Sequence, residues 1–389
     1  MMIREFYLTH KGKLLVACAA VVLVVVNAQG ASSRTTLASP FARAETIAAA
    51  PTVLSGKINC EEPPAAVRDI VTVSKFGRDG RLHDSTTIDP GDAAEYANDV
   101  RAVTVFSRRV SRLADGFADQ SPNGVRNARC ALFWMNDWAE QDALLGRVNP
   151  AGEAVRKWEL GTLAAAYLKI RNAPHDPVQA QRVRKWLAEI ARAVQSDYSR
   201  NLKNDSRANN HINWAAWSVM AAAIAADDDV LFDWSLDRFR FALAQISPDG
   251  TLPLELKRRQ LALAYHDFAL APLLLLQEGA AANGVSLTPD ERQGLQRLIN
   301  LVLFGLVDPR AMDARTGYVQ DLTAITPTQL AWLEPYYART RDPRAKALLD
   351  QYRPLISTRL GGNLTLLFGE PGAVQSAMQA QAGATPQRP

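Results

Sequence analysis

Two amides and an imidazole stand together at Asn209-Asn210-His211, directly before an apolar run that extends from residue 212 to residue 224. The run predicts a helix, so these polar side chains fall beside the free N–H groups and the positive end of its dipole. Such a group of donors would hold a carboxylate well. An asparagine cap followed by a packed histidine is the alternative interpretation, because asparagine is a common N-cap.

A second candidate pair, Arg258 and Tyr265, lies in the segment 253–276, whose pattern predicts one helix. The two residues are seven positions apart, close to two turns, so both are expected on one face. A guanidinium and a phenol on one face suit the binding of an acidic sugar and the transfer of its proton. The alternative is a solvated basic patch beside a core tyrosine.

The sequence contains none of the common motifs for metal binding or nucleotide binding. The five histidines are scattered, and the chain has no His-x-x-x-His, Cys-x-x-Cys or Gly-x-Ser-x-Gly pattern and no Gly-rich phosphate loop. We therefore expect no metal ion and no cofactor.

Repeated amphipathic helices must position these clusters, because apolar residues recur three and four apart from about residue 90 to residue 365. Helices are expected at Tyr96–Leu113, Ala131–Leu145, Trp158–Arg171, Val178–Tyr198, Trp214–Ala226, Leu231–Gln245, Pro253–Leu276, Pro289–Phe304 and Thr328–Arg339. Helices this numerous with short loops predict an all-α fold, either an α/α toroid or an irregular bundle.

The N-terminal residues are typical of an export signal. A positive start is followed by an apolar run from Leu14 to Val26, which is too short for a permanent membrane anchor. Small residues allow cleavage after Gly30 or after Ala44. We therefore expect a periplasmic or secreted protein with no stable membrane anchor, a signal and lead segment at 1–44, one domain at 58–365 and a disordered tail at 369–389.

Charge and cysteine content are interpreted on the chain without residues 1–44. Its formal net charge falls from +4 to 0, so bulk charge predicts no nucleic acid partner, and an acidic polymer would need a local basic cluster. Cys60 and Cys130 are the cysteines that remain. In an oxidising compartment an isolated pair predicts a disulfide.

Two segments resemble a known family. Asn209-Asn210-His211-Ile-Asn213-Trp214 is similar to the Asn-Asn-His-x-x-Trp segment of the mannuronate-preferring alginate lyases, polysaccharide lyase family 5. Residues 252–266 resemble that family's second signature, in the same order and at a matching distance. Further similarity at 130–145, 157–170 and 332–336 extends the resemblance over about residues 58–360.

The resemblance implies an incomplete (α/α) toroid with a deep substrate cleft, and a lyase that cleaves β-1,4-linked mannuronate by β-elimination. Asn210, His211 and Arg258 would bind the uronate carboxylate, and Tyr265 would act as base and then as acid, with Arg258 lowering its pKa. His211 is a second candidate base, for guluronate. Substrate contacts are expected from Lys75, Trp158, Trp214 and Arg259.

Substrate is the open part of this interpretation. Where the family commonly has tyrosine, the chain has Phe76 and Asn213, so sugar contacts do not transfer directly. A lyase of polyglucuronate or of a hyaluronan-like polymer would use the same machinery, and a periplasmic protein that binds a uronate polymer without cleaving it is a further alternative. An acidic polysaccharide is the expected partner and a monomer the expected state.

Overall fold

Helices form nearly all of the regular structure in the computed structural model, which describes residues 36–41, 59–76, 87–200, 202, 205–372 and 374. The longer helices are α2 (Pro90–Asp99), α3 (Arg101–Ala118), α4 (Gly124–Glu140), α5 (Pro150–Ile170), α6 (Pro177–Ser199), α8 (Asn210–Ala226), α9 (Asp229–Ala244), α11 (Ala262–Ala282) and α12 (Pro289–Val307). α15 (Pro343–Tyr352) is as long as α2, and the shorter helices are α7 (Asp205–Ala208), α10 (Pro253–Leu256), α13 (Arg310–Thr316), α14 (Leu333–Thr340) and α16 (Leu364–Phe368). A small antiparallel ribbon pairs β1 (Ile356–Ser357) with β2 (Gly362–Asn363). The predicted all-α class is confirmed.

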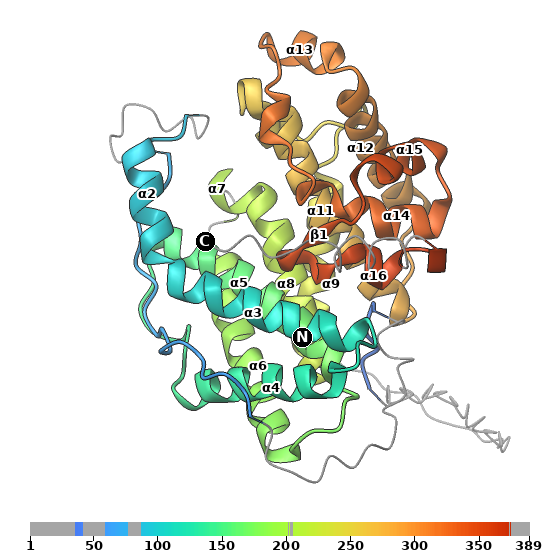
Figure 1. The fold of residues 1–389 in the computed structure, drawn as a ribbon. Coiled ribbons are helices and arrows are strands. Elements are labelled where there is room, and N and C mark those ends of the chain that lie inside the picture. Colours follow the sequence, from blue (N-terminus) through green and yellow to red (C-terminus); the bar gives the residue numbers. More distant parts are fainter. Residues whose placement is uncertain are drawn as a thin grey trace, which may run out of the picture. The chain divides into compact units, whose positions relative to one another are not determined.

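The helices pack in two series (Figure 1). In the first, α3, α5, α8 and α11 each contact the next, and the short helix η3 (Gln329–Trp332) and α14 follow α11. In the second, α4, α6, α9 and α12 do the same, and each also packs against the first series. Because α8 touches α5, α6, α9 and α11, it is enclosed by other helices, which explains the largely apolar sequence after its first turn. Paired series of this kind form the predicted α/α toroid.

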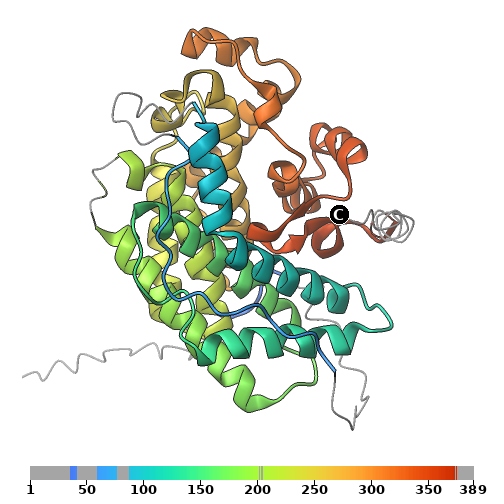
Figure 2. The ribbon, with the colours of Figure 1, turned by 60° about the vertical axis from the view of Figure 1, so that its left-hand side comes forward.

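The C-terminal elements return to the first series. β2 and α16 contact α3, and the short helix η4 (Thr358–Leu360) contacts α5. Figure 2 shows these segments in red beside the blue-green α3. The loop that carries Arg359 is thereby fixed against the middle of the fold.

Local sequence explains where several helices begin. Asn149 and Asp176 each stand before a proline and accept a hydrogen bond from a first-turn N–H group of α5 and α6, respectively. Thr288 and Glu291 form a capping box at the start of α12. α6 begins and ends within one residue of its predicted bounds, and its start follows from the Asp176 cap.

Two segments predicted as single helices are broken. Val100 separates α2 from α3, and the predicted helix 253–276 divides into α10, the short helix η1 (Arg259–Leu261) and α11. Arg259 adopts a left-handed φ of 52° at the second break. The Gln320 side chain donates to the Arg259 carbonyl oxygen at 3.0 Å and accepts from the Leu263 N–H at 2.9 Å. A residue far along the chain therefore ends one helix and starts the next.

Residues 36–41 form an extended strap against the helical body. Leu37 and Phe41 are 1% and 0% exposed. Asp227 accepts from the Leu37 N–H, and the Asn283 amide bonds both backbone groups of Ala38. The prediction of a lead segment outside the fold is wrong for these residues, and the compact unit begins at Thr36 rather than at residue 58. Distant polar side chains satisfy the backbone of the strap, which the local sequence does not reveal.

Several predictions concern the segments near the two ends of the chain. The Cys60–Cys130 disulfide, with 5.5 Å between the Cα atoms, is confirmed and ties the N-terminal segment to α4. Val374 is buried in the main core, so the predicted disordered tail begins too early. The predicted signal, with both its cleavage sites, and residues 375–389 lie outside the described residues. Within the described residues, none of the helices has the length and apolar character to cross a membrane.

Candidate active site

The start of α8 places Asn209-Asn210-His211 as predicted. Asn209 caps the helix, because its side-chain oxygen accepts from the His211 N–H at 3.0 Å. The backbone N–H and the side-chain Nδ2 of Asn210 both donate to Oε1 of Glu255, at 2.7 and 3.0 Å. Glu255 is 1% exposed, and its burial raises its pKa against the opposing effects of Arg258 and Asn210. This buried carboxyl fixes the orientation of the Asn210 amide.

His211 is surrounded by cations. Its Nδ1 lies 2.7 Å from Nζ of Lys157, and its ring lies 5.9 Å from the Trp158 ring. Burial, reinforced by Lys157 and then by Arg258, holds the pKa of His211 well below its usual value. His211 is therefore a neutral imidazole in the physiological range.

Arg258 and Tyr265 meet, although not through the predicted helical spacing. Arg258 lies between α10 and η1, outside α11, and its guanidinium carbon stands 4.4 Å from the centre of the Tyr265 ring. Arg258 Nε also approaches Glu255 Oε2 at 3.6 Å. The helix break brings the guanidinium over the phenol. The two side chains are therefore adjacent, as predicted, although they do not lie on one face of a single helix.

The expected depression of the Tyr265 pKa is not found in the free protein. Arg258 does lower the pKa, but burial is the larger effect and raises it, and Glu255 raises it further. At this half-buried position the phenolate loses more solvation free energy than it gains from its attraction to one guanidinium. Tyr265 therefore stands as a phenol until alkaline pH.

Arg359, which the sequence did not indicate, stands beside Trp158. Its guanidinium carbon lies 4.1 Å from the Trp158 ring centre, and its carbonyl oxygen accepts from the Trp217 indole N–H at 2.9 Å. Lys75 stands with its Nζ 4.4 Å from the Tyr96 ring centre. Burial and Arg359 both lower the Lys75 pKa.

Lys75 and Arg359 border a hollow between α2, α3 and the Arg359 loop, which we call the α2–α3 hollow; Lys75 is the one predicted site residue among those that line it. Its volume is about 290 Å³, and it is lined by Lys75, Tyr96, Ala97, Val100, Arg101, Thr104, Val105, Arg108, Glu159, Thr358 and Arg359. Four of these residues are basic and one is acidic. The described residues thus include a local basic cluster of the kind that binds an acidic polymer.

Two predicted contact residues face other parts of the protein. Trp214 is 3% exposed; its indole donates to the Phe268 carbonyl oxygen and its ring lies 4.8 Å from the Phe268 ring. Arg259 is exposed, and its guanidinium carbon lies 5.7 Å from the Tyr318 ring centre. Asn213 is also buried and donates to the Ala269 carbonyl oxygen at 3.0 Å. Trp214 and Asn213 therefore join α8 to α11 in the interior of the protein.

Sequence reasoning missed Lys157, Glu255 and Arg359. Lys157 and Glu255 carried a usable signal, because a charged residue inside an otherwise apolar helical pattern is rarely buried without a role. Arg359 lies in a stretch without periodicity, where the sequence offers no comparable signal.

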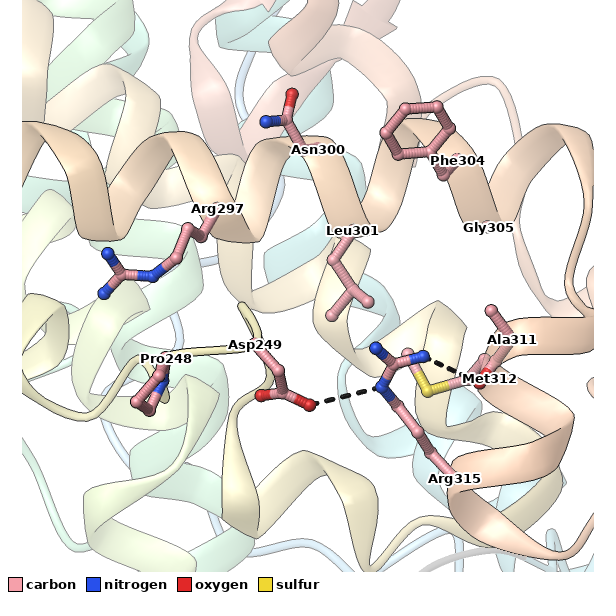
Figure 3. A pocket seen from close by; sticks show the side chains of 10 residues that line it. All are labelled: Pro248, Asp249, Arg297, Asn300, Leu301, Phe304, Gly305, Ala311, Met312 and Arg315. Atoms are coloured by element: carbon pink, nitrogen blue, oxygen red, sulfur yellow. Dashed lines mark hydrogen bonds and ion pairs between the residues drawn. The ribbon is translucent and has the colours of Figure 1, made fainter.

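A second hollow, of about 340 Å³, lies between α12, α13 and residues 248–249 (Figure 3). Its arginines are engaged within the chain, since Arg315 pairs with Asp249 and Arg297 donates to the Ser247 carbonyl oxygen. None of the predicted site residues lines it. Among the described residues no three His, Cys, Asp or Glu side chains group as metal ligands.

Residues 82–312 match the model of the family described as alginate lyase. Relatives named alginate lyase occur in Pseudomonas fluorescens (35% identity over 74% of this chain and 82% of the relative), Pseudomonas aeruginosa (34%, 80% and 85%) and Azotobacter vinelandii (39%, 68% and 72%). Among solved structures, a variant of alginate lyase A1-III complexed with a tetrasaccharide shares the fold with a TM-score of 0.72 and 24% identity, over 87% of this chain and 98% of the other. Alginate lyase A1-III from Sphingomonas species A1 gives a TM-score of 0.67 with 23% identity over the same shares. The chain belongs to the alginate lyase family.

Proposed function

We propose that this protein cleaves alginate at β-1,4-linked mannuronate by β-elimination and leaves a 4,5-unsaturated uronate at the new end. The observation that carries the proposal is the Arg258 guanidinium, 4.4 Å from the Tyr265 ring centre and joined to Asn210 through Glu255. Elimination beside a carboxylate needs a cation to stabilise the developing charge and a group that moves a proton. The two are adjacent here.

Asn210, His211 and Arg258 bind the uronate carboxylate in this proposal. Asn210 gives one amide N–H to Glu255 and keeps a second for the substrate, and the neutral His211 has one N–H to donate. The C5 proton is weakly acidic while the neighbouring carboxylate carries its full charge. Donors and a guanidinium stabilise the enolate-like charge as the proton leaves.

Tyr265 moves the proton. As a phenolate it takes the C5 proton; the C5–H electron pair forms the C4–C5 double bond, and the C4–O bond breaks. The phenol then returns the proton to the leaving glycosidic oxygen, so the residue ends as it began. In mannuronate the C5 hydrogen and the C4 oxygen lie on one face of the ring, so a single residue serves both steps, whereas in guluronate they do not.

An acidic polysaccharide fits the α2–α3 hollow because Lys75, Arg101, Arg108 and Arg359 face it. Cations spaced along a cleft bind successive carboxylates of a polyanion. The related enzyme A1-III has been solved in complex with a tetrasaccharide, which supports a binding site several sugars long.

The test follows ultraviolet absorbance, which rises as unsaturated uronate forms, on polymannuronate, polyguluronate, polyglucuronate and hyaluronan. We expect a rise on polymannuronate that Tyr265→Phe abolishes. Tyr337→Phe is the matched control, since Tyr337 packs against Arg341 and lies outside the candidate site. A rise confined to polyglucuronate or hyaluronan would change the substrate and keep the mechanism. Binding of a polymer without any rise would favour a binding protein.

We further propose that the protein is exported to the periplasm and that its signal is cleaved after Gly30. The positive start and the apolar run from Leu14 to Val26 support export. Cleavage after Ala44 would remove Leu37 and Phe41 from the core, whereas cleavage after Gly30 retains both. The intact mass of protein recovered from the periplasm distinguishes the two sites, and retention in the cytoplasm would contradict export.

A further inference from the structure

Lys157 is a buried lysine whose amine forms its hydrogen-bond contacts with two neutral side chains. It stands on α5 with 0% exposure, and its Nζ donates to the Tyr198 hydroxyl at 2.9 Å and contacts His211 Nδ1 at 2.7 Å. None of the ion pairs found among the described residues includes Lys157. The nearby carboxylates are engaged by other cations, Glu153 by Arg207 and Asp197 by Arg156.

The contact with His211 fixes the direction of a hydrogen bond. Burial, reinforced by Arg359 and Arg207, lowers the pKa of Lys157 well below its usual value. We take Lys157 in its ammonium form, which has donors and no acceptor, so that Nδ1 of His211 accepts and carries no proton. A neutral imidazole then holds its one proton on Nε2. Protonation of both nitrogens is opposed by burial and by the cations Lys157, Arg258, Arg207 and Arg359, in that order.

We propose that Lys157 is a positioning residue that holds His211 as the neutral Nε2–H form, so that His211 donates to the substrate carboxylate and does not act as a base. The inference rests on the proposed function for its catalytic meaning, but the proton position is a property of the free protein. Tyr198, through its hydroxyl, holds the Lys157 amine in line with the ring.

A consequence for substrate choice follows. In guluronate the C5 proton lies on the face opposite to that in mannuronate, so its removal needs a second base there. A protonated Nε2 has no lone pair to accept that proton. Lys157 therefore removes His211 as a guluronate base, and the mannuronate preference depends in part on a residue that never touches the sugar.

The first measurement is the ¹⁵N spectrum of the histidine-labelled chain, in which a protonated ring nitrogen and a bare one resonate far apart. We expect His211, assigned by its loss in His211→Gln, to show Nε2–H and bare Nδ1 at neutral pH. A proton on Nδ1 in the unaltered protein would overturn the inference, without any use of substrate.

The second measurement compares Lys157→Met, which keeps the volume and removes the N–H donors, with Tyr198→Phe, which keeps the amine. In Lys157→Met we expect a mixture of both proton positions and a fall in kcat on polymannuronate in proportion to the Nε2–H fraction that is lost, about twofold where the two forms are equally populated. We also expect a rise in the guluronate to mannuronate rate ratio. Tyr198→Phe should retain Nε2–H. An unchanged proton position and unchanged kcat in a folded Lys157→Met would refute the inference; Nε2–H without cleavage of any polymer would refute the proposed function instead.

Discussion

Replacing Phe41 with alanine removes a side chain that is fully enclosed although it precedes the predicted domain by seventeen residues. Its ring meets those of Trp217 and Phe368 edge to face, at 6.3 and 6.1 Å. Loss of a buried phenylalanine costs about 3–5 kcal/mol of unfolding free energy, and two aromatic contacts place Phe41 within that range. We take about 4 kcal/mol, which corresponds to a fall in Tm of roughly 8 °C at about 2 °C per kcal/mol.

The assay is thermal unfolding of the chain that begins at residue 31. Phe304→Ala is the matched control, because Phe304 is 62% exposed on α12 (Figure 3) and its loss should change stability by less than about 0.5 kcal/mol. A chain that begins at residue 45 lacks the whole strap and should unfold at or below the Tm of Phe41→Ala. Equal Tm values for the chains that begin at residues 31 and 45 would refute the packing of the strap.

The strap also bears on the site. Gly361 has a φ of 135°, and a Cβ there would stand 2.8 Å from Phe41 Cζ, so the ring lies directly against the turn that follows Arg359. Phe41→Ala should therefore lower kcat/KM on polymannuronate even well below its Tm, and Phe304→Ala should leave it unchanged. Unchanged kcat/KM in folded Phe41→Ala would show that the Arg359 loop holds its place without the strap.

Further outcomes follow from the same contacts. Arg359→Met should raise KM for polymannuronate about tenfold or more through the loss of one carboxylate contact, measured against Arg297→Met from the other hollow; equal KM values would exclude Arg359 from binding. Because burial raises the Tyr265 pKa and the base is its phenolate, kcat/KM should rise with pH, tenfold per unit, until the phenol ionises in the alkaline range; a flat profile would exclude the phenolate. Reduction of Cys60–Cys130, which are 70 residues apart, should cost about 4 kcal/mol of unfolding free energy by denaturant titration; an unchanged midpoint would contradict this.

The sequence predicted the parts of the fold that local rules determine. Apolar periodicity located α6 to within one residue at each end and α8 at its C-terminal end, although α8 begins at Asn210 rather than at the predicted Trp214. The caps Asp176 and Asn209 explain the observed starts, since a helix start depends on residues within one turn. The break before α11 was missed because Gln320, distant in sequence, caps it. The sequence of residues 253–276 contains no pattern from which a contact with Gln320 could be predicted.

The two histidines near the predicted clusters show the same limit within the site. His266 follows Tyr265 in the chain, yet it is fully buried, accepts from the Leu252 N–H and contacts the Ala262 carbonyl oxygen, which is a structural role. His211 is half-buried at a helix start beside Lys157. The sequence predicted a site role for His211 alone. The surroundings of the two histidines, formed by other helices, show why their roles differ.

The cations around the site are held close together at a cost in electrostatic free energy, and a bound anionic substrate lowers that cost. Burial lowers the pKa of Lys157, His211, Lys75 and Arg359, and raises that of Glu255, so the free protein holds its cations against desolvation and mutual repulsion. A bound uronate carboxylate relieves both effects. Because negative charge grows on the substrate as the C5 proton leaves, the relief is larger in the transition state than in the bound ground state, and that difference is what lowers the barrier. The all-helical core makes this possible, because rigid helices on several sides keep like charges close that would separate on a flexible surface.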